Sequence, residues 1–159
     1  MSLCILPVFL STWLQRLACS LDRRNHERFW SVFFGLLVTR ERRRTASSWF
    51  RAGDIGDDFR QAYHTLGSVG REATNMATTV LLEVERSVAT QDEDRLVFAI
   101  DDTPSKRYGP CVEGAGIHYN PTPGPTGQKF LYGHVFVTLA RVVTHSDWGT
   151  IALPIRSDL

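Results

Sequence analysis

The spacing of apolar residues changes near residue 90, and this change constrains the fold more than any other feature of the sequence. Before residue 90, apolar side chains recur every three or four residues, as one face of a helix requires. Examples are Trp13, Leu14 and Leu17, then Phe29, Trp30, Phe33, Phe34 and Leu37, then Val80, Leu81, Val84 and Val88. After it, short runs of strand-forming residues follow. We therefore expect an α+β fold, with helices over residues 1–90 and strands over residues 91–159.

The helical part should consist of several short helices. Glycines at 53 and 56 and at 67 and 70 suit helix ends, and Asp57 could cap a helix that continues through Phe59 and Tyr63. The apolar start of the chain has no basic leading region, and Pro7 interrupts it well short of the ~20 residues that span a bilayer. We expect it to form a helix that packs on the body, and neither a signal peptide nor a membrane anchor.

Three strands are expected in the second part. Residues 96–100 form a short apolar run that predicts a buried strand, and residues 132–143 and 149–155 predict two more, with Ser146 and Asp147 as the turn between the last two. Residues 108–128 are rich in glycine and proline and predict a long surface loop without regular structure. The three strands should form an antiparallel meander.

Charge is distributed unevenly along the chain. The net charge of the 159 residues is only +1, yet residues 22–51 contain eight arginines against three acids. Such a region suits contact with phosphates, although a solvated helix face has the same composition. The three cysteines have no CxxC spacing, so the sequence indicates neither a disulfide framework nor a cysteine zinc site, and a cytoplasmic protein fits.

Residues 45–53 could form a DNA-recognition helix. Thr45 would be its amino-terminal cap, Trp49 and Phe50 would pack, and the exposed side chains would be Ser47, Ser48 and Arg51. Arginines before this helix would grip the DNA backbone, namely Arg40, Arg42, Arg43 and Arg44. The alternative is a small helical bundle without groove contacts.

The sharpest candidate site is Asp101-Asp102-Thr103, at the expected carboxyl end of the first strand. A strand holds a carboxylate still, and Mg²⁺ prefers oxygen ligands, so a metal site is one interpretation. A turn cap or a solvated sheet edge is the other. Residues 123–130 lack the glycine spacing of a phosphate-binding loop, and residues 113–116 sit inside a loop and so form no dinucleotide fingerprint, which leaves no nucleotide cofactor to expect. His118 and His145 lack metal-ligand spacing, and His134 should be a hydrogen-bonded core residue.

Residues 98–155 resemble the first part of the catalytic domain of insertion-sequence DDE transposases. The resemblance is carried by IDDTP, KRYG, VEGAGIHYNPTPGP, LYGH and WGTIALP, in that order. It implies the start of an RNase H-like fold and assigns the first catalytic, metal-binding acid to Asp102, with Asp101 as the alternative. The helical half is similar, less distinctively, to the family's DNA-binding region.

The resemblance also implies an activity and its partners. Two Mg²⁺ ions held by an Asp-Asp-Glu triad would promote phosphodiester hydrolysis at transposon ends and then strand transfer. DNA is the expected partner, a homo-oligomer is compatible with the family, and no small-molecule substrate is expected. Basic residues beside the loop could touch DNA phosphates, namely Lys106, Arg107 and Lys129.

The expected catalytic set is incomplete in this sequence. The second aspartate and the glutamate of the family lie beyond residue 159, and Asp158 is expected in an exposed tail where it cannot replace them. We therefore expect a truncated domain that does not cut DNA by itself. A noncatalytic DNA-binding remnant, or a short product that interferes with the full enzyme, is the alternative function.

Overall fold

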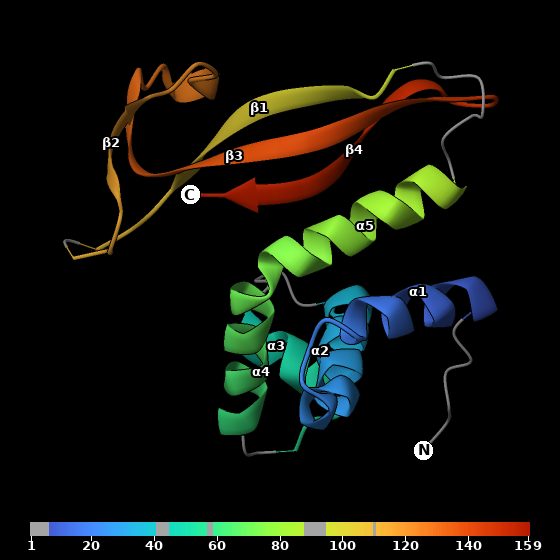
Figure 1. Cartoon of the computed structure of the whole chain (residues 1–159). Helices are drawn as coiled ribbons and strands as arrows, with labels where there is room; N and C mark the ends of the chain where they lie inside the picture. Colours follow the sequence, from blue (N-terminus) through green and yellow to red (C-terminus); the bar gives the residue numbers. More distant parts are fainter. Residues whose placement is uncertain (1–6, 41–44, 57–58, 88–94, 110) are drawn as a thin grey trace. The chain divides into compact units, whose positions relative to one another are not determined.

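The computed structural model describes residues 7–40, 45–56, 59–87, 95–109 and 111–159 (Figure 1). The chain forms two compact units, Met1–Glu83 (unit 1) and Val84–Leu159 (unit 2). The described residues hold five α-helices followed by a four-stranded antiparallel sheet, which confirms the α+β class. The division falls inside the last helix, whereas the sequence suggested residue 90.

The helices are short, as expected. They are α1 (Val8–Ala18), α2 (His26–Val38), α3 (Ala46–Ala52), α4 (Arg60–Arg71) and α5 (Ala73–Ser87), with a 3-10 turn, η1 (Arg23–Asn25), before α2. Burial of apolar side chains holds unit 1 together in two clusters. The first contains Leu14, Leu17, Ala18, Leu21 and Phe29, and the second contains Val32, Phe50 and Ala62. Helix α1 therefore packs on the body, as its sequence predicted.

Two of the expected helix boundaries can be compared with the structure. Gly53 follows α3, which confirms that break. Gly67 and Gly70 lie inside α4, so the break predicted there is wrong. Glycine costs a helix interior about 1 kcal/mol, and the buried Ala62 and Thr65 on the same helix offset that cost by packing. Asp57 lies outside the described residues.

Helices α2 and α3 approach each other unusually closely. A Cβ atom added at Gly35 would lie 1.8 Å from the carbonyl oxygen of Trp49, and one added at Gly53 would lie 2.1 Å from that of Ser31. Neither distance is compatible with a side chain, so glycine is required at both positions. The pair fixes α3 directly against the backbone of α2.

The sheet of unit 2 is built around one long strand. Its strands are β1 (Val97–Lys106), β2 (Gly116–Tyr119), β3 (Phe130–His145) and β4 (Gly149–Asp158). Strand β1 pairs with one edge of β3, while β2 and β4 pair with successive parts of the other edge. The three expected strands and the turn at Ser146 and Asp147 are confirmed, with Gly149 at φ 68° closing that turn.

Two predictions about unit 2 are wrong. Strand β1 continues to Lys106, so Asp101 and Asp102 lie in its middle and not at its end. The apolar run that defined the predicted strand ends at Ile100, but pairing with β3 continues to Lys106, and the edge position of β1 in the described sheet tolerates Pro104. The glycine- and proline-rich segment also contains regular structure, because β2 gains hydrogen bonds from the edge of β3 and η2 (Gly124–Thr126) forms a 3-10 turn.

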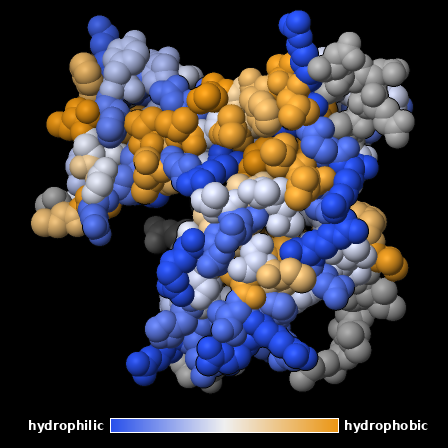
Figure 2. Space-filling view, viewed as in Figure 1, coloured by the Kyte–Doolittle hydropathy of each residue, from blue (hydrophilic) through white to orange (hydrophobic). Residues whose placement is uncertain are grey.

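The first strand is also less buried than its apolar sequence predicted. Val97, Phe98 and Ile100 are 53%, 40% and 73% exposed. Figure 2 shows hydrophobic residues gathered over the strands, on the surface of the described chain. An apolar strand is buried only if another layer covers it, and sequence pattern alone does not reveal whether that layer is present.

Candidate functional site

Register places the two candidate aspartates on opposite faces of the sheet. Strand β1 pairs with β3 along its whole length, with Asp102 opposite Val137 and Asp101 opposite Thr138. Successive side chains of a strand alternate between faces, so only one of the two carboxylates can face a given metal site. Both aspartates are exposed.

The surroundings of the two carboxylates differ. Asp102 shares its face with Ile100 and Val137, which are 73% and 46% exposed, and Leu139 also lies on this face. Asp101 lies opposite Thr138, whose hydroxyl contacts that of Ser157 at 2.7 Å. Asp102 is therefore a charge flanked by accessible apolar side chains, whereas Asp101 has a hydroxyl-bearing neighbour opposite it.

Asp158 lies in a strand, which corrects the expectation of a tail. It is the last residue of β4 and pairs with Val137, so it stands on the same face and in the same row as Asp102. Two strand spacings of about 4.8 Å separate these two acids, roughly 10 Å between Cα atoms. Arg156 binds both oxygens of Asp158, at 2.5 and 3.0 Å. Asp158 is thus ion-paired and set apart from Asp102.

Metal ligation by the described residues is limited by the number of donors. No group of three His, Cys, Asp or Glu side chains in the described ranges comes close enough to hold an ion. Asp102 carries carboxylate oxygens, the donor type that Mg²⁺ prefers, in the middle of β1. The donor type fits Mg²⁺, but one carboxylate is too few to place two ions.

The cap of the proposed recognition helix is as predicted, but one of its expected exposed residues is buried. The Thr45 hydroxyl accepts a hydrogen bond from the Ser48 backbone N–H, and the Ser48 hydroxyl accepts one from the Thr45 N–H. This capping box confirms Thr45 as the cap. Ser48 is only 1% exposed, so it cannot read a DNA groove. The spacing of residues does not reveal that its hydroxyl faces inward to cap the helix.

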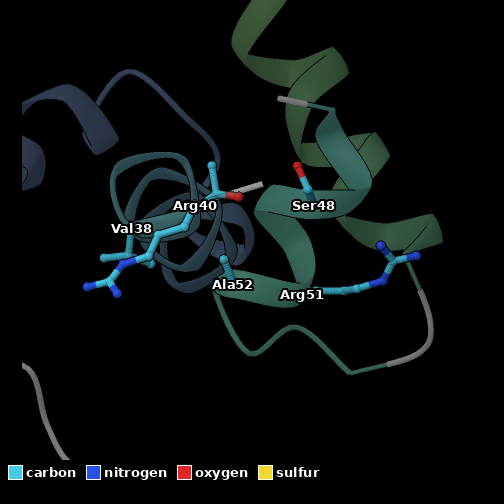
Figure 3. Close-up of a pocket in the computed structure, with 6 residues that line it drawn as sticks. Val38, Arg40, Ser48, Arg51 and Ala52 are labelled. Carbon is cyan, nitrogen blue, oxygen red and sulfur yellow. The ribbon is translucent and has the colours of Figure 1, made fainter. Parts of the chain in front are cut away.

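Arg40 and Arg51 lie at opposite ends of one shallow pocket. The pocket has a volume of about 580 Å³, and Ser48 forms part of its wall. In Figure 3 the two guanidinium groups extend away from each other. Arg51 also lies over the ring of Phe59, 6.0 Å from its centroid. Ser47 is half-buried, and its hydroxyl contacts that of Thr45 at 3.0 Å.

The other basic residues expected to contact DNA lie before α3 and beside the glycine- and proline-rich segment of unit 2. Arg42, Arg43 and Arg44 lie outside the described residues. Lys129 is exposed, and the Lys106 ammonium lies 5.5 Å from the centroid of the Tyr108 ring.

Arg107 has a structural partner. Its Nε donates to Nδ1 of His134 at 3.0 Å, and Nε2 of His134 contacts the carbonyl oxygen of Glu113 at 2.8 Å. Because an arginine can only donate, Nδ1 is the acceptor and Nε2 carries the proton. His134 is 8% exposed, which confirms it as a hydrogen-bonded core residue. Arg107 and His134 together therefore fix both ends of the segment before β2 to β3.

The sequence interpretation counted Arg24 and Arg28 within the arginine-rich region 22–51 but did not connect them with His64 and Arg71. Arg24, Arg28, His64 and Arg71 line one pocket of unit 1. The available signal was the spacing of Arg60, His64 and Arg71, which places all three on one face of a helix. That spacing becomes informative only once α4 is known to continue through its glycines.

Comparisons of the chain with protein-family models, with curated proteins and with solved structures find no match. Within the described ranges, no helix combines the length and the apolar character needed to cross a bilayer.

Proposed function

We propose that this chain is a segment of a DDE-type transposase of an insertion sequence. In this proposal unit 1 binds DNA, and Asp102 supplies the first metal-ligating carboxylate of an RNase H-like catalytic domain. The carrying observation is the position of Asp102, an exposed carboxylate flanked by apolar side chains in the middle of an edge strand that pairs with β3 along its whole length. The family motifs of residues 98–155 support the same assignment.

The surroundings of Asp102 favour it over Asp101 as the metal ligand. A charge among apolar side chains is costly once that face is covered, unless a cation or hydrogen-bond donors compensate it. In this proposal Mg²⁺ compensates the negative charge of Asp102. When bound by a complete set of carboxylates, Mg²⁺ would activate the attacking oxygen and stabilise the leaving oxygen of a phosphodiester.

The remaining carboxylates must come from outside the described donor set. Strand β1 pairs only with β3 in the described sheet, so the edge of β1 beside Asp102 is open to another strand. A further element carrying acids can pair there and bring its side chains next to Asp102. The role of this chain is then to position one ligand and to bind DNA.

The incomplete donor set also favours a second candidate function. A noncatalytic DNA-binding protein would use unit 1 alone, and Asp102 would be an ordinary exposed acid. The two functions differ in whether a divalent ion recognises Asp102.

A Mn²⁺ titration followed by NMR tests the metal assignment. Mn²⁺ replaces Mg²⁺ and broadens signals close to its site, so we expect selective broadening of the amides of Asp102 and Val137. Asp102→Asn should abolish this effect, while Asp101→Asn, the matched control, should leave it. If Asp101→Asn abolishes the broadening and Asp102→Asn does not, the metal ligand is Asp101. If Mn²⁺ causes no selective broadening in the wild-type protein, the noncatalytic function is favoured.

A salt titration tests DNA binding by unit 1. Each phosphate contact contributes about −0.9 to the slope of log affinity against log salt concentration. We expect the Arg40→Ala/Arg51→Ala variant to have a slope smaller by about one to two, and Arg42/Arg43/Arg44→Ala to weaken binding to all sequences equally. Arg95→Ala, at an exposed position of unit 2, is a control for the loss of a single arginine outside unit 1. Equal slopes for wild type and variants would contradict this contact set.

A further inference from the structure

A basic pocket lies between η1, α2 and α4 within unit 1. It has a volume of about 510 Å³, within the range of about 300–1,000 Å³ typical of ligand sites. The residues that matter for its chemistry are Asp22, Arg24, Arg28, His64, Ser68 and Arg71. Three arginines thus face one aspartate, and none of the six belongs to the contact set tested above.

The positive charge of this pocket comes mainly from Arg28 and Arg71. Arg24 binds both oxygens of Asp22 at 3.1 Å, and this hydrogen bonding lowers the pKa of Asp22 to about 2. Asp22 is therefore ionised at neutral pH and offsets Arg24. In the described part of the chain, no carboxylate lies within ion-pair distance of Arg28 or Arg71.

Hydrogen bonds fix the walls of the pocket relative to each other. The Asn25 amide, just before α2, donates to the Ser68 hydroxyl at 3.4 Å, and the Thr65 hydroxyl donates to Asn25 at 3.2 Å. Arg71 donates to the same Ser68 hydroxyl at 2.9 Å, while Arg28 donates to the carbonyl oxygen of Arg24 at 3.0 Å. Both arginines are thus anchored by one N–H group and keep further donors for a ligand.

The basic surface continues along α4. A neighbouring pocket of about 280 Å³ shares His64 and Arg71 and adds Arg60 and Gly67. The rise of 1.5 Å per residue places Arg60 and Arg71 about 16 Å apart along the helix axis, and phosphates of one DNA strand follow each other every ~3.4 Å along the duplex. The Arg71 guanidinium lies beside Gly67, because a Cβ atom added at Gly67 would lie 3.6 Å from Nη1 of Arg71.

We propose that the groove formed by these two neighbouring pockets binds phosphate groups of the DNA backbone, with Arg28 and Arg71 as the contacting residues. Guanidinium groups match phosphate oxygens in geometry and charge. The inference rests on the proposed DNA binding by unit 1, but it assigns that binding to a surface separate from Arg40 and Arg51. Contacts to phosphates alone carry no sequence information, so binding through this groove is independent of base sequence.

The test is a salt titration of the whole chain on transposon-end and scrambled duplexes. Arg28→Gln and Arg71→Gln should each reduce the salt slope by about one on both duplexes. Arg23→Gln is the matched control, because Arg23 is an exposed neighbour in η1 that does not line the pocket. Its slope should equal that of wild type. Thermal unfolding midpoints identify any variant that fails to fold.

A second measurement uses only the wild-type protein and so does not depend on whether a variant folds. Phenylglyoxal modification of arginines, read by mass spectrometry, should show Arg28 and Arg71 protected by duplex DNA and Arg23 unprotected. If the wild-type protein binds duplex DNA with a salt-dependent affinity but Arg28 and Arg71 are not protected, this inference is overturned and the proposed function still stands. If the wild-type protein binds no duplex, both are overturned. Protection by inorganic phosphate but not by duplex would assign the pocket to free phosphate and overturn the DNA inference.

Discussion

At the scale of single residues, Arg141 is the least expected feature of the sheet. This β3 arginine has no exposed surface, and its Nε lies 2.5 Å from the Glu85 carboxylate. It also donates to the carbonyl oxygens of Val97 and Val142. The guanidinium therefore satisfies one acid and two backbone groups of unit 2. A buried arginine in an apolar strand is tolerable only because these partners compensate its lost hydration.

Removal of Arg141 should be costly. Arg141→Ala leaves Glu85 without this partner and opens a cavity, so we expect a loss of about 3 kcal/mol in the free energy of unfolding of unit 2. Arg141→Met/Glu85→Gln keeps volume without an unpaired charge and should lose less than the alanine variant. Urea unfolding followed by circular dichroism measures both. Equal stability of Arg141→Ala and wild type would show that the ion pair contributes nothing.

Glycines of unit 1 provide a second residue-scale prediction. Gly35→Ala places a Cβ atom 1.8 Å from the carbonyl oxygen of Trp49, so α2 and α3 must separate, at an expected cost of about 3 kcal/mol or more. Gly70→Ala is the matched control, because an added Cβ meets nothing within 4 Å inside α4. It should stabilise by about 0.5–1 kcal/mol through helix propensity. Opposite shifts in thermal midpoint are expected, and shifts of the same sign would contradict the packing of α2 on α3.

The choice between Asp101 and Asp102 could not be made from alternation alone. Alternation requires the two side chains to point to opposite faces, but it does not say what each face contains. The pairing register with β3 supplies this information, because it places Val137 opposite Asp102 and Thr138 opposite Asp101. Ser48 shows the same limit in a helix, where its burial depends on a capping contact and not on its spacing.

At the scale of elements, periodicity predicted the helices and the three main strands, whereas local signals for where an element ends were correct at Gly53 and misleading elsewhere. Glycines inside α4, and the end of the apolar run at Ile100 inside β1, suggested ends that the structure does not have. In both cases contacts between elements outweigh the local signal, which for glycine in a helix is a preference of about 1 kcal/mol. Strand β2 was missed because it is only four residues long and forms by pairing with β3.

The segment between β1 and β2 should depend on one histidine. His134 contacts the Glu113 carbonyl oxygen and accepts a hydrogen bond from Arg107, so both ends of this segment are fixed to β3. We expect His134→Ala to increase amide hydrogen exchange across residues 107–119 at least tenfold, a loss of about 1.4 kcal/mol of local stability. His145→Ala is a control, since His145 stacks on Trp148 in the β3–β4 turn. Unchanged exchange would show that the segment is held by other contacts.

At the scale of the whole molecule, the order of helices before strands could be predicted from the sequence, but the burial of the sheet could not. Leu96, Val97 and Ile100 have the composition of a covered strand, yet they are 59%, 53% and 73% exposed. Burial depends on which other elements face a strand, and this information lies outside the strand's own sequence. For the same reason, the basic groove between η1, α2 and α4 could not be predicted from the sequence, because it depends on how these elements pack in unit 1.

The chain is not expected to cut DNA, because a single carboxylate does not make a complete two-metal site. Two-metal hydrolysis requires several carboxylates around ions about 3.5–4 Å apart, and Asp102 alone cannot hold such a pair. Bound to an end-labelled transposon-end duplex with Mg²⁺ or Mn²⁺, the chain should leave both strands intact on a denaturing gel, while a shift on a native gel shows that it is bound. Asp102→Ala should give the same two results. Reproducible nicking that Asp102→Ala abolishes would show instead that other residues of this chain, or of a second copy, complete the site around Asp102.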